Sequence, residues 1–170
     1  MPRCRWSSRL PARSRKIYGM KTAFISNSFA AYRGSALEVV GGFPSNTILS
    51  EDMYVAAKML MQGYGIAYVA EAKVFHSHNY SICEEGKRYF DIGVFHGREK
   101  WIRNNFGNAE KTGKGFIKYE LMKLIRRPWL LPVMCLRDTV KYLCYRLGML
   151  EKNLPNIVKK SISMNPKYWK

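Results

Sequence analysis

The sequence predicts an α/β domain with an incomplete sheet, followed by a basic helical extension. A helix with acidic residues in its first turn precedes two short strand-like segments, which is an α/β pattern. The few strands that can be found are too short and too few to make a sheet with both faces covered. Residues 100–170 carry sixteen basic and four acidic residues, a net charge of +12, in amphipathic segments.

The first part of the chain contains three segments that differ in composition. Residues 1–16 are rich in Arg, Ser and Pro without periodicity, so we expect a disordered or non-native start. Residues 21–33 mix small and large apolar side chains and predict one or two buried extended segments. Residues 35–40 predict a short helix, which Gly41 and Gly42 end because glycine accepts a left-handed backbone.

The clearest helix is predicted to begin after Ser50. Serine is a favourable N-cap, and Glu51 and Asp52 suit the positive end of the helix dipole. Gly63 is expected to end this helix. Acidic residues at a helix start are common without any function, so the pair alone leaves both a structural and a catalytic role open.

Two short strands, 66–69 and 73–76, are predicted next, and the second ends on a histidine. His76 and His78 are two residues apart, so both rings would lie on the same face of a strand. Strand ends are where sites of α/β folds collect. The alternative for both histidines is an ordinary core or surface position.

The rest of the chain predicts helices. Residues 82–105 predict one helical stretch, and residues 107–115 predict a Gly-, Asn- and Lys-rich loop. Residues 116–127 and 130–147 predict two amphipathic helices, broken at Pro128. The apolar positions of the second helix either dock onto the domain or lie among lipid headgroups.

The charge distribution narrows the classes of partner. The total is +17, but residues 21–99 carry seven basic and eight acidic residues, so the middle is nearly neutral between two basic ends. Solvated helix faces, an anionic membrane surface and nucleic acid each explain a basic end. Nucleic-acid binding predicts basic and aromatic residues interleaved on one folded surface, and this chain instead carries its charge at the ends.

Hydropathy and cysteine spacing exclude further classes. The longest apolar run, residues 129–136, is eight residues long and contains a proline, so no spanning helix is expected. The four cysteines have neither CxxC nor zinc spacing and predict free thiols in a reducing cytosol. They are Cys4, Cys83, Cys135 and Cys144.

Several motifs, taken in order, resemble the second half of family 2 glycosyltransferases of the GT-A fold. They are Arg33, Gly41-Gly42-Phe43, Glu51-Asp52, Lys58, Gly63, the strand Ile66-Ala67-Tyr68-Val69, Ala72, Val74 and His76. The stretches SNSFAAYRGSALEVVGGFP, ILSEDMYVAAKM, AYVAEAKVFHSHNYS and RYFDIGVFHGREKW are similar to bacterial rhamnosyltransferases of polysaccharide assembly, as is the closing SMNPKYW more weakly.

The resemblance implies residue roles. Asp52 would be the general base that takes the proton of the acceptor hydroxyl, and Glu51 would cap the helix and orient the site. His76, 24 residues beyond Asp52, would be a ligand of a divalent metal, Mn or Mg, which neutralises the leaving diphosphate. His78 would be structural or lie behind the ligand. Lys58 stands where many relatives carry Arg.

The resemblance also implies an organisation and a function. Residues 17–106 would be the acceptor-side half of a GT-A catalytic domain, and residues 107–170 the basic extension. The metal site would be incomplete, because the Asp-x-Asp motif of the family's first half does not occur in the chain. We therefore expect an inverting glycosyltransferase fragment that transfers a sugar, with rhamnose expected, from a nucleotide-diphospho-sugar donor.

The expected acceptor is a polysaccharide or a lipid-linked saccharide of cell-envelope synthesis. The expected place is the cytoplasm, with peripheral binding to the anionic inner face of the cell membrane. The alternatives are a non-catalytic remnant of the same fold that binds or regulates, and a basic nucleic-acid-binding protein.

Overall fold

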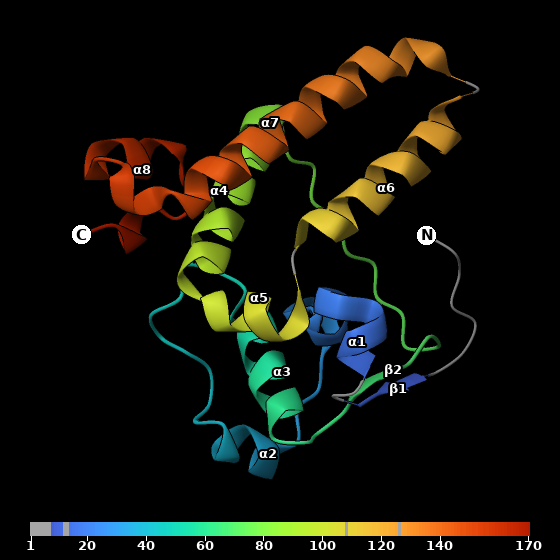
Figure 1. Cartoon of the computed structure of the whole chain (residues 1–170), viewed down its shortest axis with the longest axis vertical. Coiled ribbons are helices and arrows are strands. Elements are labelled where there is room, and N and C mark those ends of the chain that lie inside the picture. The colour runs from blue at the N-terminus through green and yellow to red at the C-terminus, as the bar shows by residue number, and fades with distance from the viewer. Residues whose placement is uncertain (1–7, 12–13, 108, 126) are drawn as a thin grey trace. The chain divides into compact units, whose positions relative to one another are not determined.

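The structure is a computed structural model that describes residues 8–11, 14–107, 109–125 and 127–170. The described residues are mostly helical, with one pair of short antiparallel strands (Figure 1), and are richer in helix than the predicted α/β class. The chain divides into two compact units. The first comprises Met1–Asn46, Ser50–His78 and Ile102–Asn108, and the second comprises Thr47–Leu49, Asn79–Trp101 and Ala109–Lys170.

The first unit is built around α3. Its elements are β1 (Ser8–Leu10), α1 (Arg15–Tyr18), the 3₁₀ turns η2 (Gly19–Ala23) and η3 (Asn27–Phe29), α2 (Gly34–Val39), α3 (Glu51–Met61), β2 (Ile66–Tyr68) and most of α5 (Lys100–Phe106). Its buried apolar side chains come chiefly from α3 and α5, and those two helices contribute Met53, Val55, Ala56, Ala57, Leu60, Ile102 and Phe106.

The predicted bounds of α3 are confirmed, but its predicted cap is wrong. Ser50 makes no side-chain capping bond and has a left-handed backbone, with φ 59°. At the other end, Gly63 has φ 85°, its N–H donates to Leu60 O, and the N–H of Tyr64 donates to Met59 O. These two bonds make a Schellman motif, for which a glycine with positive φ is the usual residue.

The segment 21–33 does not form the one or two buried extended segments that its composition predicts. It forms η2 and η3, and the side chains of Phe24 and Phe29 are exposed. The Ser26 hydroxyl accepts a hydrogen bond from Ser28 N at the start of η3. Serine and asparagine side chains that bond nearby backbone compete with strand formation, which accounts for the difference.

Only one of the two predicted strands forms. β2 pairs with β1 in an antiparallel register that sets Ser8 opposite Tyr68 and Leu10 opposite Ile66. Three residues of the segment expected to be disordered are therefore in a strand, while residues 1–7 and 12–13 lie outside the described part. The predicted strand 73–76 is exposed irregular chain, and no described strand pairs with it.

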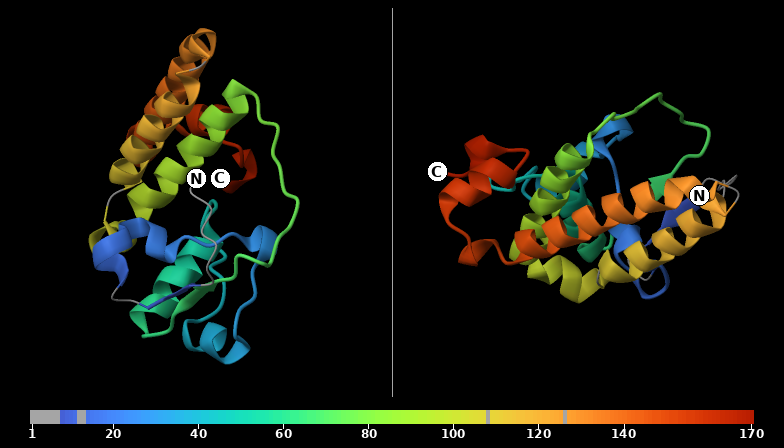
Figure 2. Two further views of the ribbon diagram at one scale, coloured as in Figure 1. Left: turned by 90° about the vertical axis from the view of Figure 1, so that its right-hand side faces the viewer. Right: turned by 90° about the horizontal axis from the view of Figure 1, so that it is seen from above.

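The second unit is a helical assembly whose main contact joins α4 and α7. Figures 1 and 2 show α6 and α7 running in opposite directions. The chain leads away from α4 along α6 and returns to it along α7. Its elements are α4 (Ile82–Arg98), α6 (Ala109–Leu124), η4 (Pro128–Leu130), α7 (Leu131–Met149), η5 (Glu151–Asn153), α8 (Asn156–Ile162) and η6 (Pro166–Tyr168).

Glycines allow α4 and α7 to approach closely. A Cβ atom at Gly93 would collide with the carbonyl oxygen of Tyr145, and one at Gly148 would collide with the carbonyl oxygen of Phe90. Met134 and Tyr145 are buried, and Val140 lies against Gly86. Two alternatives were open for the second amphipathic helix. Docking onto the protein is confirmed for one of its faces.

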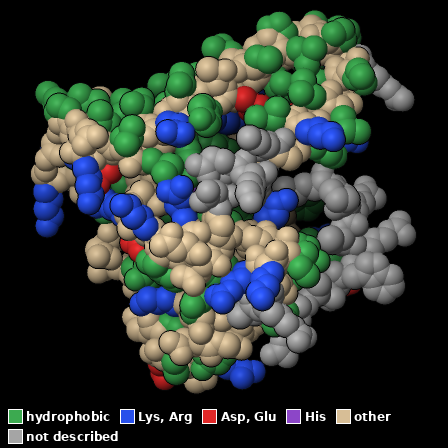
Figure 3. Space-filling view, viewed as in Figure 1, with side chains coloured by type: hydrophobic (Ala, Val, Ile, Leu, Met, Phe, Trp, Pro, Cys, Tyr) green, Lys and Arg blue, Asp and Glu red, His purple; other side chains and the backbone are tan. Residues whose placement is uncertain are grey.

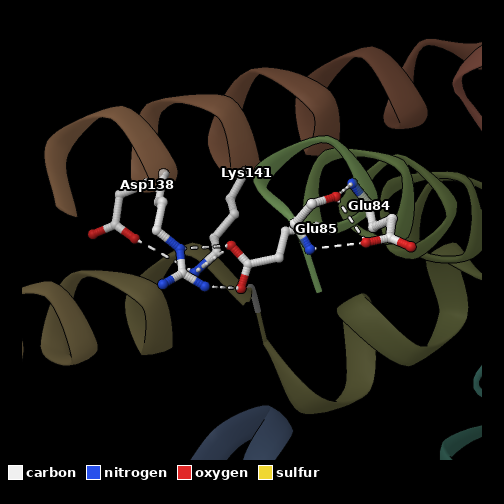
Figure 4. Close-up of polar contacts among 6 residues, drawn as sticks. Glu84, Glu85, Asp138 and Lys141 are labelled. Atoms are coloured by element: carbon white, nitrogen blue, oxygen red, sulfur yellow. Dashed lines mark hydrogen bonds and ion pairs between the residues drawn. The ribbon is translucent and has the colours of Figure 1, made fainter. Parts of the chain in front are cut away.

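Polar contacts fix the same helix pair (Figure 4). Glu84 completes a capping box with Ser81 at the start of α4. Glu85 accepts a hydrogen bond from Arg137 Nε at 3.0 Å and lies 3.6 Å from Lys141 Nζ. The Arg137 hydrogen bond holds the pKa of Glu85 below its usual range. Two basic residues of α7 are therefore committed to α4.

The closing stretch 163–169 also packs on α4. The fully buried Asp91 accepts hydrogen bonds from Met164 N at 3.1 Å and Asn165 Nδ2 at 3.0 Å. The Trp169 ring lies beside Phe90 and has the Arg98 guanidinium 5.4 Å from its centre. This stretch is therefore a structural strap of the second unit.

The remaining helix predictions are largely confirmed. The stretch 82–105 is α4 and α5, interrupted at Glu99, and a break at Pro128 separates α6 from α7. The predicted loop 107–115 is wrong, since α6 begins at Ala109. Helix propensity costs about 1 kcal/mol for each glycine, which the longer helix tolerates. Within the described ranges, no helix combines the length and apolarity that crossing a membrane requires.

Candidate functional site

The candidate site lies within the first unit, where η3 contacts two distant segments. Asn27 N donates to Asp52 Oδ2 at 3.2 Å, and Asn27 Nδ2 donates to Glu51 Oε1 at 2.9 Å. The next residue, Ser28, places its hydroxyl 3.1 Å from His76 Nε2. Adjacent residues of one short turn therefore hold the helix start and the histidine segment.

Asp52 combines partial burial with hydrogen bonds. Its Oδ1 accepts from Met53 N at 2.7 Å, and its Oδ2 accepts from Asn27 N. Burial raises its pKa above the usual value, and the negative charge of Glu51 adds to the rise, while the two hydrogen bonds oppose it. A carboxylate with a raised pKa is a better proton acceptor than an ordinary aspartate.

Tyr32 also contacts Asn27. We call the residues joined by these contacts the η3 node, and they are Asn27, Ser28, Tyr32, Glu51, Asp52 and His76. The hydroxyl of Tyr32 donates to Asn27 Oδ1 at 2.7 Å, and its ring packs edge-on against Phe43 with centroids 5.2 Å apart. Burial, and then the negative charges of Asp52 and Glu51, raise the pKa of Tyr32 to about 12. Tyr32 is therefore a protonated donor at neutral pH, and it orients the Asn27 amide.

The backbone before the carboxylates is unusual. Ser50 is the sole residue other than glycine with a positive φ in the described part of the chain. A left-handed backbone at a residue with a side chain is uncommon, and such strained positions cluster at functional sites. Here it directly precedes Glu51 and Asp52, whose carboxylates both contact η3.

The histidines lie in an exposed segment rather than on a strand. His76 and His78 have ring centroids 4.3 Å apart and perpendicular planes. The two rings therefore meet, as their spacing predicts, although the strand that was to carry them does not form. His76 reaches Ser28, and through it lies near the residue that contacts Asp52.

A metal ion needs more ligands than this arrangement supplies. Among the described residues, no group of three or more His, Cys, Asp and Glu side chains could hold one. His76 supplies a single nitrogen, which already meets a serine hydroxyl. The residues described here do not fit a divalent metal by themselves.

Lys58, which stands where many relatives carry Arg, has structural partners. Its ammonium donates to Val40 O at 3.2 Å and lies 4.9 Å from the centre of the Tyr54 ring. Lys58 thus joins α3 to the end of α2.

The sequence placed Asn27, Ser28 and Tyr32 in the motif-bearing stretch SNSFAAYR but indicated no role for them. The Ser-Asn-Ser run, which favours local turns, was the signal.

Comparisons with known proteins agree on one family. The protein-family model described as "Glycosyl transferase family group 2" matches residues 11–151 of this chain. The O-antigen chain rhamnosyltransferase WbaN of Salmonella anatum is 48% identical over 155 residues, which cover 91% of this chain and 49% of that relative. The O-antigen chain rhamnosyltransferase RfbN of Salmonella typhimurium is 49% identical over 152 residues, 89% of this chain and 48% of that relative.

The chain thus spans about half the length of the curated relatives it matches. No solved structure shows a significant match to it.

Proposed function

Because the chain belongs to glycosyl transferase family group 2, we propose that it carries the acceptor side of an inverting sugar transfer. The donor is a nucleotide-diphospho-sugar, and the two rhamnosyltransferase relatives favour rhamnose as its sugar. The acceptor is a polysaccharide or a lipid-linked saccharide. The observation that carries the proposal is the η3 node, which holds Asp52, Glu51 and His76 together.

Asp52 acts as the general base of this reaction. As the acceptor oxygen forms its bond to the anomeric carbon, its proton passes to the Asp52 carboxylate. The bond from that carbon to the diphosphate breaks, and the nucleotide diphosphate leaves with the electron pair. Attack from the face opposite the leaving group inverts the anomeric centre. The raised pKa of Asp52 supports this role.

Glu51 and Tyr32 support the base without meeting the sugar. Glu51 binds the Asn27 amide, and its negative charge raises the proton affinity of Asp52. Tyr32 holds the other end of the same amide. The node thereby fixes the carboxylate at the start of α3.

The donor side is proposed to come from sequence that this chain does not contain. The chain covers about half of each relative, and it has no Asp-x-Asp motif. We propose residues 17–106 as the acceptor-side part of a GT-A domain, with His76 as one ligand of a metal site completed by the other half. The reaction would take place in the cytoplasm, where the family's nucleotide-linked donors are expected.

A fusion tests the proposal. The half of the Salmonella typhimurium relative that this chain does not cover is joined to the chain, and sugar transfer from a nucleotide-diphospho-rhamnose is measured with a polysaccharide acceptor. We expect transfer with inversion of the anomeric centre, read by NMR of the product. The chain alone is the control and should show no transfer.

A folded fusion that binds donor but transfers no sugar would contradict the proposal. That result would favour the second reading, a non-catalytic remnant of the same fold.

A further inference from the structure

One face of α7 is apolar and exposed, although the opposite face packs on α4. Its exposed apolar side chains are separated by three, seven, four and three residues, which places them on one side of a helix. They are Val133, Leu136, Leu143, Leu147 and Leu150, each between 43% and 55% exposed. We call these residues, with Trp129 of η4 at 69% exposure, the α7 outer face. Figure 3 shows apolar side chains gathered along the edge formed by α6 and α7.

The charges beside the α7 outer face are of one sign. Glu85 engages Arg137 and Lys141 on the α4 side, so these two are not the outward charges of the helix. Asp138, the acidic residue of α7, is only 17% exposed and lies 3.8 Å from Lys141. The exposed charged residue of α7 is Arg146, and Arg127, the residue before η4, is also exposed. The outer face therefore combines apolar side chains with positive charge.

This combination favours a membrane over a second copy of the chain. An apolar stripe on one side of a helix would by itself also suit a helical partner, as in a coiled coil. A second copy would bring Arg127 and Arg146 near the same positive residues, with no exposed acid on η4 or α7 to pair with them. Anionic lipid headgroups supply the missing negative charge, and the acyl boundary accepts leucine and tryptophan.

We propose that the α7 outer face binds an anionic lipid surface. The helix lies in the plane of the interface, with Trp129 and the leucines inserted at the headgroup boundary and Arg127 and Arg146 among the headgroups. The face is distinct from the η3 node, and the proposal does not depend on the transferase chemistry. Arg137 and Lys141, which are paired with Glu85, have no part in this lipid contact.

Co-sedimentation of the full chain with vesicles tests the proposal. We expect binding to vesicles of phosphatidylcholine with phosphatidylglycerol, and much weaker binding to phosphatidylcholine alone. Arg146→Gln should lower the partition coefficient at low salt by about fivefold. Lys160→Gln, an exposed charge change on α8, is the matched control and should leave it nearly unchanged.

The apolar contribution is tested separately at high salt, where headgroup attraction is screened. Trp129→Ala should lower the remaining binding by about tenfold. Ile157→Ser on α8, where the isoleucine is 79% exposed, should not. Equal losses for both variants, or no binding to anionic vesicles, would overturn the proposal. A dimer in analytical ultracentrifugation that Leu143→Ser dissociates would also overturn it, because the face would then belong to a second copy.

Discussion

Asn27 is the residue on which the candidate site depends. Its backbone N–H reaches Asp52, its amide nitrogen reaches Glu51, and its amide oxygen accepts from Tyr32. An asparagine supplies both donors and an acceptor, whereas aspartate would place a third negative charge in the node. The sequence showed Glu51 and Asp52 as a motif, but it could not show Asn27, because the contact joins residues 25 positions apart.

Burial is the main cause of the raised pKa of Asp52, and the negative charge of Glu51 adds to it. The Glu51 charge raises the pKa of Asp52, so Glu51→Gln should lower that pKa. The amide of the variant can still accept from Asn27, which preserves the node. We expect the acidic limb of the kcat/KM profile of the fused enzyme to move to lower pH. Glu38→Gln, an exposed change on α2, should not move it, and an upward move for Glu51→Gln would contradict the assigned charge effect.

Asp52 should lower stability at neutral pH. Its pKa is raised in the folded chain, so the folded state binds the proton more tightly than the unfolded state. The stability that this gives is present below the unfolded pKa of about 3.9 and is lost as the pH rises through the folded pKa. Asp52→Asn should therefore raise the Tm at pH 7 and raise it less at pH 3.

The asparagine keeps one oxygen for Met53 N, and the Asn27 N–H, which lies in an exposed segment, turns to water. Thermal unfolding followed by circular dichroism at the two pH values measures the difference. A Tm that falls at pH 7 would show that Asp52 is a stabilising residue and not a strained one.

At the scale of elements, the contact between α4 and α7 is the structural centre of the second unit. It depends on glycines, since a methyl group at Gly93 would meet the backbone of α7. Gly93→Ala should lower the free energy of unfolding by about 1–3 kcal/mol or more, because neither backbone can move aside alone. The measurement is chemical denaturation of the full chain.

Gly115→Ala is the matched control. Gly115 lies on the exposed surface of α6 with nothing near a built Cβ atom, so alanine should stabilise the helix by about 0.5–1 kcal/mol. Opposite signs for the two variants are expected. Similar losses for both would mean that glycine serves the helices in some way other than close packing.

The sequence predicted helices better than strands and loops, for physical reasons. α3, α4 and α7 carry apolar residues at helical spacing, and that signal is local. A strand also needs a neighbouring strand, and residues 73–76 pair with none in the described part of the chain. The loop expected at 107–115 was inferred from its Gly, Asn and Lys content, but an exposed helix tolerates Gly113 and Gly115. The pattern of residues 130–147 predicted an amphipathic helix, but the sequence could not show that Arg137 and Lys141 are paired with Glu85.

At the scale of the whole molecule, the chain is a family member that covers about half of its curated relatives. Its motifs, read in order, predicted the family correctly, because several of them occur together in the order and at the spacing of that family. The division into residues 17–106 and 107–170 stays a prediction, as the compact units group residues by contact and not by function. No described residue of this chain is assigned to binding of the sugar donor.

The central claim is that Asp52 takes the acceptor's proton, and the transfer rate of the Asp52→Asn fusion tests it most directly. The amide keeps the size and one hydrogen bond of the carboxylate but cannot accept the proton, so sugar transfer should fall about 10²–10⁴-fold. Glu38→Gln in the same fusion should transfer at the parent rate, and both variants should show folded circular dichroism spectra. Transfer by a folded Asp52→Asn fusion at a rate close to that of the parent would contradict the claim.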